Sequence, residues 1–197
     1  MTLALDGAAQ DLLFRAAHTA HAFTDEPVTD EQLRAVYDLV KYGPTAFNQS
    51  PLRITLVRSP EARERLVAQL SEGNRAKTAA APLTAIVSVD LGFHERLPEL
   101  LPHAPGLKDQ FFSELPVRER TGTFNAAIQL GYLIVGIRAA GLAAGPMTGF
   151  DAEGINKEFF GDGRRKVLAV VNIGRPGPDS YRPRSPRLAY EDVVTTV

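Results

Sequence analysis

Asn74 and Lys77 are a pair of residues whose types and spacing suggest ligand chemistry. They are three residues apart, so in a helix they share one face, where an amide and a cation could meet the same polar edge of a ligand. Thr45 and Asn48 lie in a second segment, residues 43–51, between a predicted helix and a predicted strand. Amide and hydroxyl groups supply both donors and acceptors, which a planar polar ligand needs.

Two further segments could contact a ligand through backbone groups or charge. Residues 145–151 form a predicted loop between two helices, and its glycines allow a backbone N–H to approach a ligand atom. Residues 175–187 contain four prolines and four arginines, a composition that predicts an extended arm lying on another surface. Arginines in such an arm could bind a phosphate through two parallel hydrogen bonds.

Each of these segments also has an ordinary structural explanation. Residues 43–51 would serve as a plain helix-to-strand connection, and an exposed Asn/Lys pair is commonly just solvated surface. Residues 145–151 could serve simply to join a helix C-cap to an N-cap. The arginines of the arm could serve simply to keep an extended segment soluble. From the residues alone, these explanations stand beside the functional ones.

Familiar catalytic signatures are missing from the sequence. It contains no G-x-S-x-G elbow, no P-loop, no H-E-x-x-H and no G-x-G-x-x-G after a strand. The absence of cysteine excludes disulfides, thiolate nucleophiles and cysteine-based zinc sites. Among the four histidines only His18 and His21 are close in sequence, which does not favour a metal site. Any nucleotide is therefore handled without a Rossmann motif.

Composition favours one intracellular domain over residues 1–197. A chain of 197 residues with 44% hydrophobic residues can bury one sizeable core. A net charge of −1 gives no global field that would recruit nucleic acid or an anionic membrane. The start of the sequence lacks the basic and apolar regions of a signal peptide, and the lack of cysteine suits a reducing compartment. We therefore expect a cytoplasmic protein.

Periodicity and capping signals predict the first helices. We expect one over residues 11–21, with inward-facing apolar residues at Leu12, Leu13, Ala16 and Ala17. A second is expected over residues 30–42, because Thr29 and Gln32 have the spacing of a capping box. Gly43 and the proline after it would end this helix, the glycine by adopting a left-handed conformation.

Alternating or short apolar runs predict strands at residues 53–58, 84–89 and 167–174. Ser59 followed by proline predicts a helix that extends to about Leu70, and Asp151 can cap a short helix that reaches Phe160. Residues 91–117 are rich in Pro, Leu and Phe without sustained periodicity, which predicts an irregular excursion.

Residues 124–140 predict a buried core helix that ends at Gly141. A membrane span is disfavoured because the stretch is shorter than about 20 apolar residues and is interrupted by Asn125, Gln129 and Arg138. Gly131 and Gly136 would let a neighbouring backbone approach closely, including that of a partner subunit.

In their order along the chain, these segments resemble the nitroreductase family of FMN enzymes, most closely its malonic semialdehyde reductases of pyrimidine breakdown. The resemblance covers nearly the whole chain, and the segments that carry it are residues 44–51, Gly73-Asn74 with Lys77, residues 141–151, the strand end Asn172-Ile173-Gly174 and residues 184–188. It implies an α+β fold with a central, mostly antiparallel mixed sheet among helices. It also implies an intertwined homodimer, whose C-terminal arm reaches the partner and whose clefts hold FMN between both subunits.

The resemblance also assigns site residues. Asn74 and Lys77 would face the pyrimidine edge of the flavin, residues 146–149 would pass close to its ring, and Thr45 and Asn48 would complete the site from the other subunit. The residues that the resemblance assigns to cofactor binding are His18, Thr19, His21, Pro44, Thr45, Asn48, Asn74, Lys77, Pro146, Met147, Thr148, Gly149, Arg182 and Arg184. No metal ligand and no catalytic side chain is assigned, because the chemistry takes place at flavin N5.

The phosphate end departs from the family pattern. Many members begin with an arginine, a basic residue and a serine, whereas residues 17–21 here read Ala-His-Thr-Ala-His, without the leading arginine. A phosphate dianion requires fixed positive charge, so we expect Arg182 and Arg184 to take a larger share of that role. Thr148 stands where many nitroreductases have a carboxylate.

By resemblance, the protein would move a hydride from NAD(P)H to flavin N5 and then to a small acceptor on the same face. The leading expectation for the acceptor is malonic semialdehyde, whose carboxylate would meet Arg53 or an arginine in the 118–120 region. One alternative is a general NAD(P)H-dependent reductase of nitroaromatics, quinones or enones. An alternative of another class is a flavin-binding protein without turnover.

Overall fold

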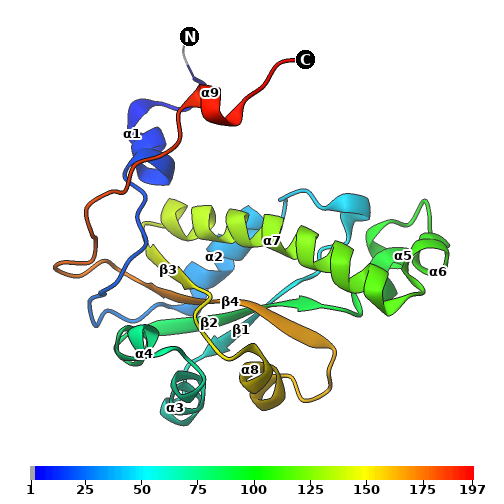
Figure 1. The fold of residues 1–197 in the computed structure, drawn as a ribbon, viewed down its shortest axis with the longest axis horizontal. Helices are drawn as coiled ribbons and strands as arrows, with labels where there is room; N and C mark the ends of the chain where they lie inside the picture. Colours follow the sequence, from blue (N-terminus) through cyan, green and yellow to red (C-terminus); the bar gives the residue numbers. More distant parts are fainter. Residues whose placement is uncertain (1–2) are drawn as a thin grey trace.

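A four-stranded antiparallel sheet forms the centre of the molecule in the computed structural model, which describes residues 3–197 (Figure 1). Its strands are β1 (Leu52–Val57), β2 (Leu83–Asp90), β3 (Ala143–Met147) and β4 (Arg165–Gly174), in the order β1-β2-β4-β3. All three strand pairs are antiparallel, and they confirm the predicted α+β class. The predictions of one domain over residues 1–197 and of a start without signal-peptide features both include Met1 and Thr2. These two residues lie outside the described part of the chain.

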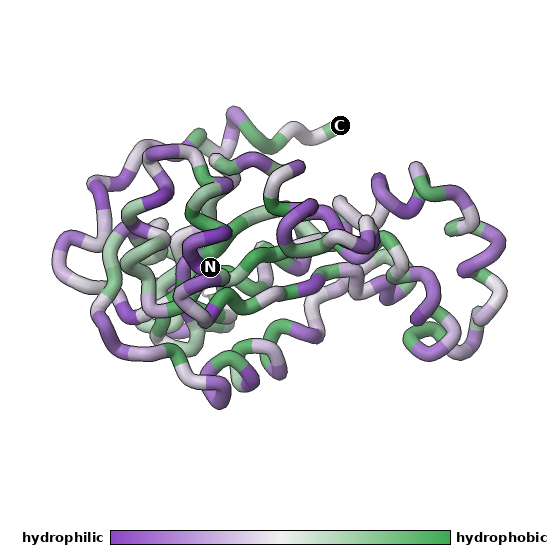
Figure 2. Tube along the Cα trace, turned by 90° about the horizontal axis from the view of Figure 1, so that it is seen from below, coloured by the Kyte–Doolittle hydropathy of each residue, from purple (hydrophilic) through white to green (hydrophobic). Residues whose placement is uncertain are grey.

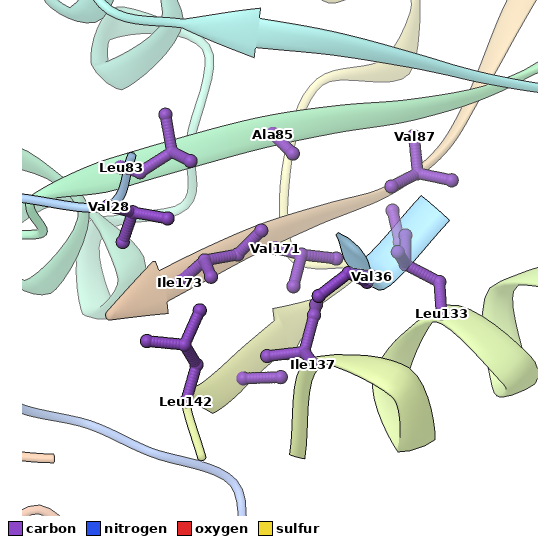
Figure 3. Close-up of a cluster of buried hydrophobic side chains, with 12 residues drawn as sticks. Val28, Val36, Leu83, Ala85, Val87, Leu133, Ile137, Leu142, Val171 and Ile173 are labelled. Carbon is purple, nitrogen blue, oxygen red and sulfur yellow. The ribbon is translucent and has the colours of Figure 1, made fainter. Parts of the chain in front are cut away.

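Helices cover both faces of the sheet (Figure 1). One face carries α2 (Asp30–Val40) and α7 (Leu115–Ala139), and the other carries α3 (Pro60–Ala68), α4 (Glu72–Ala79) and α8 (Ala152–Phe159). Figure 3 shows the core on the first face, where side chains of β2 and β4 pack against α2 and α7, among them Val36, Val87, Leu133, Ile137 and Val171. A second core on the other face joins Ile86 and Val170 to the two helices α3 and α8. The sheet is thus buried on both sides.

The capping box predicted for α2 is present. The Gln32 N–H donates to Thr29 Oγ1 at 3.2 Å, and the Thr29 N–H donates to Gln32 Oε1 at 2.9 Å. The predicted end was wrong in its cause, because Gly43 is not among the residues with positive φ. Instead the ring of Tyr132 occupies the space of a Cβ at Gly43, at 2.9 Å, so packing rather than a left-handed turn requires glycine there.

α7 is a helix of 25 residues, longer than the predicted 124–140, because its first turns are polar and lie outside the apolar run. It ends as predicted before Gly141, whose φ of +73° suits glycine. Gly136 packs against α2 of the same chain, where a Cβ would lie 2.1 Å from Val40 Cγ1. A Cβ at Gly131 would meet no atom of another part of the described chain within 4 Å. Among the described residues, no helix is both long and apolar enough to cross a membrane.

The N-terminal helix differs from its prediction. It consists of α1 (Gly7–Gln10) followed by a π-helical turn, η1 (Asp11–Arg15), and the chain is extended from there. Asp6 Oδ1 caps it by accepting the Ala9 N–H at 2.8 Å, a signal upstream of the predicted start. Leu12 is 43% exposed, because this segment lies outside the two cores and has no apolar surface to cover on that side.

The segment predicted as an irregular excursion contains three short helices, η3 (Phe93–Arg96), α5 (Leu97–Leu100) and α6 (Leu107–Phe112). Helices of four to six residues are too short to show a periodic pattern, which is why the sequence signal failed. α5 and α6 project from one end of the molecule (Figures 1 and 2). Phe93 and Phe112, with ring centroids 5.3 Å apart, anchor this projection.

The predicted loop at residues 145–151 is partly wrong, because Ala143–Met147 forms strand β3. Gly145 and Pro146 disfavour strands, but β3 is an edge strand, and proline is tolerated at an edge. The two strands β3 and β4 pair from Ala143 with Gly174 to Met147 with Val170. The true loop is therefore shorter and leads to Asp151, which caps α8 as predicted by accepting the Gly154 N–H at 3.0 Å.

Residues after β4 form an extended arm, as the proline content predicts, and only α9 (Tyr190–Val193) is helical. The arm runs beside the N-terminal segment (Figure 1) and is hydrogen-bonded to it, for example through Arg184 and Ser180. In Figure 2 the hydrophobic colour follows the strands at the centre, whereas the arm alternates between hydrophilic and hydrophobic residues on the outside.

Candidate functional site

A pocket of about 410 Å³ lies where four parts of the chain meet. The N-terminal segment contributes residues 17–19 and His21, α7 contributes Ile134 and Arg138, β3 contributes Ala144 and Pro146, and the arm contributes residues 182–185 and Arg187. We call it the cationic pocket. It brings together six of the residues predicted to bind the cofactor: His18, Thr19, His21, Pro146, Arg182 and Arg184.

Backbone hydrogen bonds fix the N-terminal wall of this pocket between β3 and the arm. The Ala20 N–H donates to Ala144 O at 3.0 Å, and the His21 N–H donates to Ser180 O at 2.9 Å. The Ser180 hydroxyl donates to Ala22 O at 2.6 Å. The segment thus behaves like an added strand without regular pairing, and residues that are far apart in sequence become neighbours.

Side chains of the arm fix the same wall. Arg184 Nη2 donates to Arg15 O at 2.8 Å and to Ala17 O at 2.7 Å. The rings of His18 and Tyr181 lie 5.3 Å apart between centroids. Part of Arg184 is therefore engaged in folding the arm over the N-terminal segment, in addition to lining the pocket.

The pocket carries positive charge. Four arginines and two histidines line it, and none of its lining residues in the described chain is acidic. Burial and the charges of Arg182 and Lys77 lower the pKa of His21, so His21 is neutral near pH 7. Burial and the charge of Arg182 also lower the pKa of Lys77. These mutual repulsions show a cluster of cations that an anion would relieve.

Asn74 and Lys77 lie on α4, which confirms the predicted helical spacing. Asn74 Nδ2 donates to Gly149 O at 2.9 Å, so this amide holds the loop after β3. A Cβ at Gly149 would lie 2.7 Å from Asn74 Nδ2, and only glycine allows this approach. Lys77 is half-buried, and burial together with the charge of Arg182 lowers its pKa, which connects α4 to the cationic pocket.

Not every predicted residue points toward this pocket. Met147 is 8% exposed and packs into the core beneath the sheet, where its sulfur accepts from Thr78 Oγ1 at 3.6 Å. Thr148 is exposed at the start of the loop that Asn74 holds. Thr148 and Gly149 therefore lie in this loop, Pro146 lines the cationic pocket from β3, and the buried side chain of Met147 anchors the end of the strand.

Pro44, Thr45 and Asn48 lie outside the cationic pocket of their own chain. Asn48 ends a short 3₁₀ turn, η2 (Ala46–Asn48), which Pro44 and the N-cap residue Thr45 precede, at the other end of the molecule beside α5 (Figure 1). Asn48 Nδ2 donates to Leu100 O at 2.9 Å, and Thr45 Oγ1 accepts the Ser50 N–H at 3.2 Å. Within one subunit, these three residues therefore lie apart from the predicted cofactor-binding residues that line the cationic pocket.

The turn at residues 45–50 is conformationally strained and firmly held. Phe47, Asn48 and Ser50 have positive φ values of 53°, 51° and 44°, a region that non-glycine residues seldom adopt. Asn125 on α7 fixes the turn by accepting the Ala46 N–H at 2.7 Å and donating to Gln49 Oε1 at 3.1 Å. Strain that is retained by such specific bonds is characteristic of functional segments.

Sequence reasoning assigned no binding role to Arg138, which lines the cationic pocket, and it named Arg187 only among the arm arginines that could bind a phosphate. The signal for Arg138 was its position as a lone arginine in an apolar helix, but it was interpreted only as an argument against a membrane span. No clustered group of three or more His, Cys, Asp or Glu residues suited to a metal ion occurs in the described part of the chain.

The architecture matches solved structures over the whole chain. A protein of Exiguobacterium sibiricum, provisionally described as a nitroreductase and crystallised in complex with FMN, aligns with a TM-score of 0.85 at 16% identity, covering 100% of this chain and 99% of that one. A Bacillus subtilis protein, also provisionally described as a nitroreductase, aligns with a TM-score of 0.83 at 20% identity, covering 98% and 100%. The chain has the nitroreductase-like fold.

Sequence comparison then identifies the family. The model of the nitroreductase family matches residues 15–175, and the chain belongs to this family. A Streptomyces coelicolor protein with the provisional name NADH dehydrogenase/NAD(P)H nitroreductase is 73% identical over 197 residues, which is 100% of both chains. A Leptothrix cholodnii protein with the same provisional name is 45% identical over 191 residues, 97% of each chain.

Proposed function

We propose that the protein is an FMN-dependent oxidoreductase that uses NAD(P)H to reduce small conjugated acceptors, and that it works as a homodimer of one-domain subunits. The observation that carries the proposal is the cationic pocket, because it combines positive charge that no acidic lining residue neutralises with Ala144 and Pro146 of β3. The names of the relatives, which refer to NAD(P)H and to nitroreductase activity, support it.

The residues of the cationic pocket fit the phosphate of FMN. A phosphate dianion requires several charge-assisted donors, and Arg182, Arg184 and the Thr19 hydroxyl meet there. His18 and His21 add ring nitrogens from the same segment. Burial, followed by the charges of Arg182 and Lys77, lowers the pKa of His21, and a bound dianion would offset those two charges.

The loop and α4 fit the ring of FMN. When bound, FMN supplies the hydride chemistry that joins NAD(P)H to the acceptor. The role of Lys77 is to hold positive charge next to the polar edge of the ring, where its lowered pKa shows that it is partly desolvated. Asn74 positions the loop through Gly149 O, so that the backbone N–H groups of residues 148–149 are fixed near the ring. Pro146 limits the pocket on the same side.

A homodimer explains the surfaces that a single chain leaves open. Large apolar side chains on α7 are solvent-exposed in one subunit, among them Phe124 at 68% and Tyr132 at 44%. Gly131 lies on the same helix with no atom near its Cβ position, which leaves room for a close neighbour. In the proposed dimer the partner's turn at residues 44–48 completes the site, and the apolar residues of the arm pack on the partner. Exposed apolar patches of this kind mark interaction surfaces.

The geometry favours conjugated acceptors over malonic semialdehyde. Phe47 and Phe111, 45% and 46% exposed, stack with centroids 5.9 Å apart beside the turn that would face the partner's flavin. Such aromatic faces suit flat nitroaromatics, quinones or enones. A malonic semialdehyde carboxylate would need a free cation. Arg53 pairs with Asp90 and Arg118 donates to three backbone carbonyls, which leaves the exposed Arg120 as the remaining predicted candidate. Malonic semialdehyde remains the second candidate because of the sequence resemblance.

The test begins with the purified protein supplied with FMN. We expect flavin absorbance that is bleached by NADH or NADPH without oxygen and restored by an acceptor. Steady-state rates with nitrofurazone, menadione and malonic semialdehyde then rank the acceptors, and we expect the first two to exceed the third in kcat/KM. A protein that binds no FMN contradicts the proposal, and bleaching without acceptor-dependent restoration would identify a flavin-binding protein without turnover.

A further inference from the structure

Arg138 is an isolated buried cation on the inner side of the cationic pocket. It lies in the last turn of α7, and only 8% of the residue is exposed. Its Nε donates to Leu12 O at 2.7 Å. Neither of its two Nη groups has a hydrogen bond to a described residue, and within residues 3–197 no carboxylate forms an ion pair with this guanidinium.

Burying a charge is costly unless it is paired. A guanidinium has five N–H donors, and one backbone carbonyl satisfies only one of them. The surrounding residues make the cost larger, because three more arginines line the same pocket and no acidic residue does so in the described chain. Buried charges that proteins retain are paired or bind a charged ligand. The natural counterpart of Arg138 is therefore an anion that enters the pocket.

A structural role alone explains only part of this arrangement. A cation near a helix C-terminus is stabilised by the helix dipole, and the bond to Leu12 O ties the N-terminal helix to α7. Both effects use the charge or Nε, and both would operate equally well with the Nη groups in solvent. They provide no protein partner for the Nη groups, which are not among the fully buried atoms and so remain accessible in the half-open pocket that Arg138 lines.

We propose that Arg138 binds the phosphate of FMN from α7 and supplies the charge that is missing from the N-terminal segment. Residues 17–21 contain no arginine, so the N-terminal wall of the pocket offers a hydroxyl and two imidazoles but no permanent cation. Arg138 lies on the wall next to it and presents its Nη groups as two donors, whose geometry matches two phosphate oxygens. This inference rests on the proposed function.

Comparison of FMN with riboflavin tests the role, because the two differ only in the phosphate. We would measure the dissociation constants of both ligands by flavin fluorescence for the wild type and for Arg138→Met. The expected result is a loss of FMN affinity on the order of tenfold or more, with riboflavin affinity changed less than about twofold. Arg34→Met, a change at an exposed arginine on α2, is the matched control and should alter neither constant.

Other outcomes overturn the inference. Equal loss of affinity for FMN and riboflavin would show that Arg138 only supports the fold, and unchanged FMN affinity would exclude the contact. If Arg138→Met does not fold, Arg138→Lys, which keeps the charge but loses the paired donors, should still weaken FMN more than riboflavin. Inorganic phosphate should compete with FMN for the wild type and much less for the variant. Failure of the proposed function looks different, since the wild type itself would then bind neither flavin.

Discussion

Asp90 is the most highly connected carboxylate in the described chain and joins three strands at one end of the sheet. Its side chain is 5% exposed and accepts from Arg53 at 2.7 Å, from Arg164 at 2.9 Å and from the Gly92 N–H at 2.8 Å. Burial by itself raises the pKa of Asp90. The hydrogen bonds from Arg164 and Gly92, and the charges of both arginines, outweigh burial and hold this pKa below its usual value.

We therefore predict a pH-dependent loss of stability in Asp90→Asn. The folded-state pKa lies below the unfolded value of about 3.9, so the charge stabilises the fold fully above that pH, and the contribution is lost as pH falls through the folded-state pKa. At pH 7 the variant should lose about 1–3 kcal/mol of unfolding free energy, because Arg53 and Arg164 are both partly exposed and can be rehydrated. Urea unfolding at several values between pH 7 and pH 3 measures the gap.

The gap between wild type and Asp90→Asn should narrow only at the acidic end of this series. A constant gap at every pH would show that the side-chain shape, rather than its charge, is what matters. Asp25→Asn provides the control, because Asp25 is exposed and takes part in no hydrogen bond or ion pair within the described chain.

At the scale of elements, a buried polar chain attaches α4 to the sheet. Thr84 Oγ1 on β2 donates to Asn172 Oδ1 on β4 at 2.9 Å, and Asn172 Nδ2 donates to Thr78 Oγ1 on α4 at 3.1 Å. All three side chains are completely buried. Because Lys77 precedes Thr78, this series of hydrogen bonds also determines where the cation of α4 lies relative to the cationic pocket.

We predict that Asn172→Leu destabilises the protein by about 1–3 kcal/mol, since it leaves two buried hydroxyls without their partner. Hydrogen exchange should increase most strongly in α4, which loses its polar attachment to β4. Urea unfolding and amide exchange measure the two effects. A triple variant that also carries Thr78→Val and Thr84→Val should recover part of the loss, because no unpaired hydroxyl remains. If amide hydrogen exchange instead rises evenly over the whole protein, the buried hydrogen bonds of Asn172 do not stabilise α4 in particular.

At the scale of the whole molecule, the proposed dimer depends on the exposed face of α7. Phe124 is 68% exposed there, on the opposite face of the sheet from α8. Placing a charge in a buried apolar interface is costly, so Phe124→Glu should convert a dimeric wild type into monomers and weaken FMN retention.

Sedimentation velocity and flavin content measure this effect. Ala152→Glu adds the same charge at an exposed position on α8 and should leave both unchanged. A wild type that sediments as a monomer, or a Phe124→Glu variant that remains dimeric, would contradict the proposed interface.

Signals that are local in sequence predicted elements well. The capping box at Thr29 and the Ser59 cap of α3 occur where expected, because hydrogen bonds within a few residues determine them. Strands β2 and β4 also occur where expected, because their own apolar, β-branched residues are typical of buried strands. β3 was missed because pairing to β4, rather than its own residue types, holds Gly145 and Pro146 in a strand. For α7 the C-terminal end was predicted, but the N-terminal end was not, since the first turns of the helix lack an apolar pattern.

The candidate site likewise has features that can be read from the sequence and features that only the folded chain creates. The sequence by itself determined which residue types were available, and the order of its motifs pointed to the nitroreductase family, which the family match confirms. Only the tertiary structure decided that residues 17–21, the arm and α7 enclose one cationic pocket, because long-range pairing brings them together. The same holds for Arg138: its type can be read from the sequence, but burial beside unpaired cations, which makes it a candidate anion ligand, exists only in the folded chain.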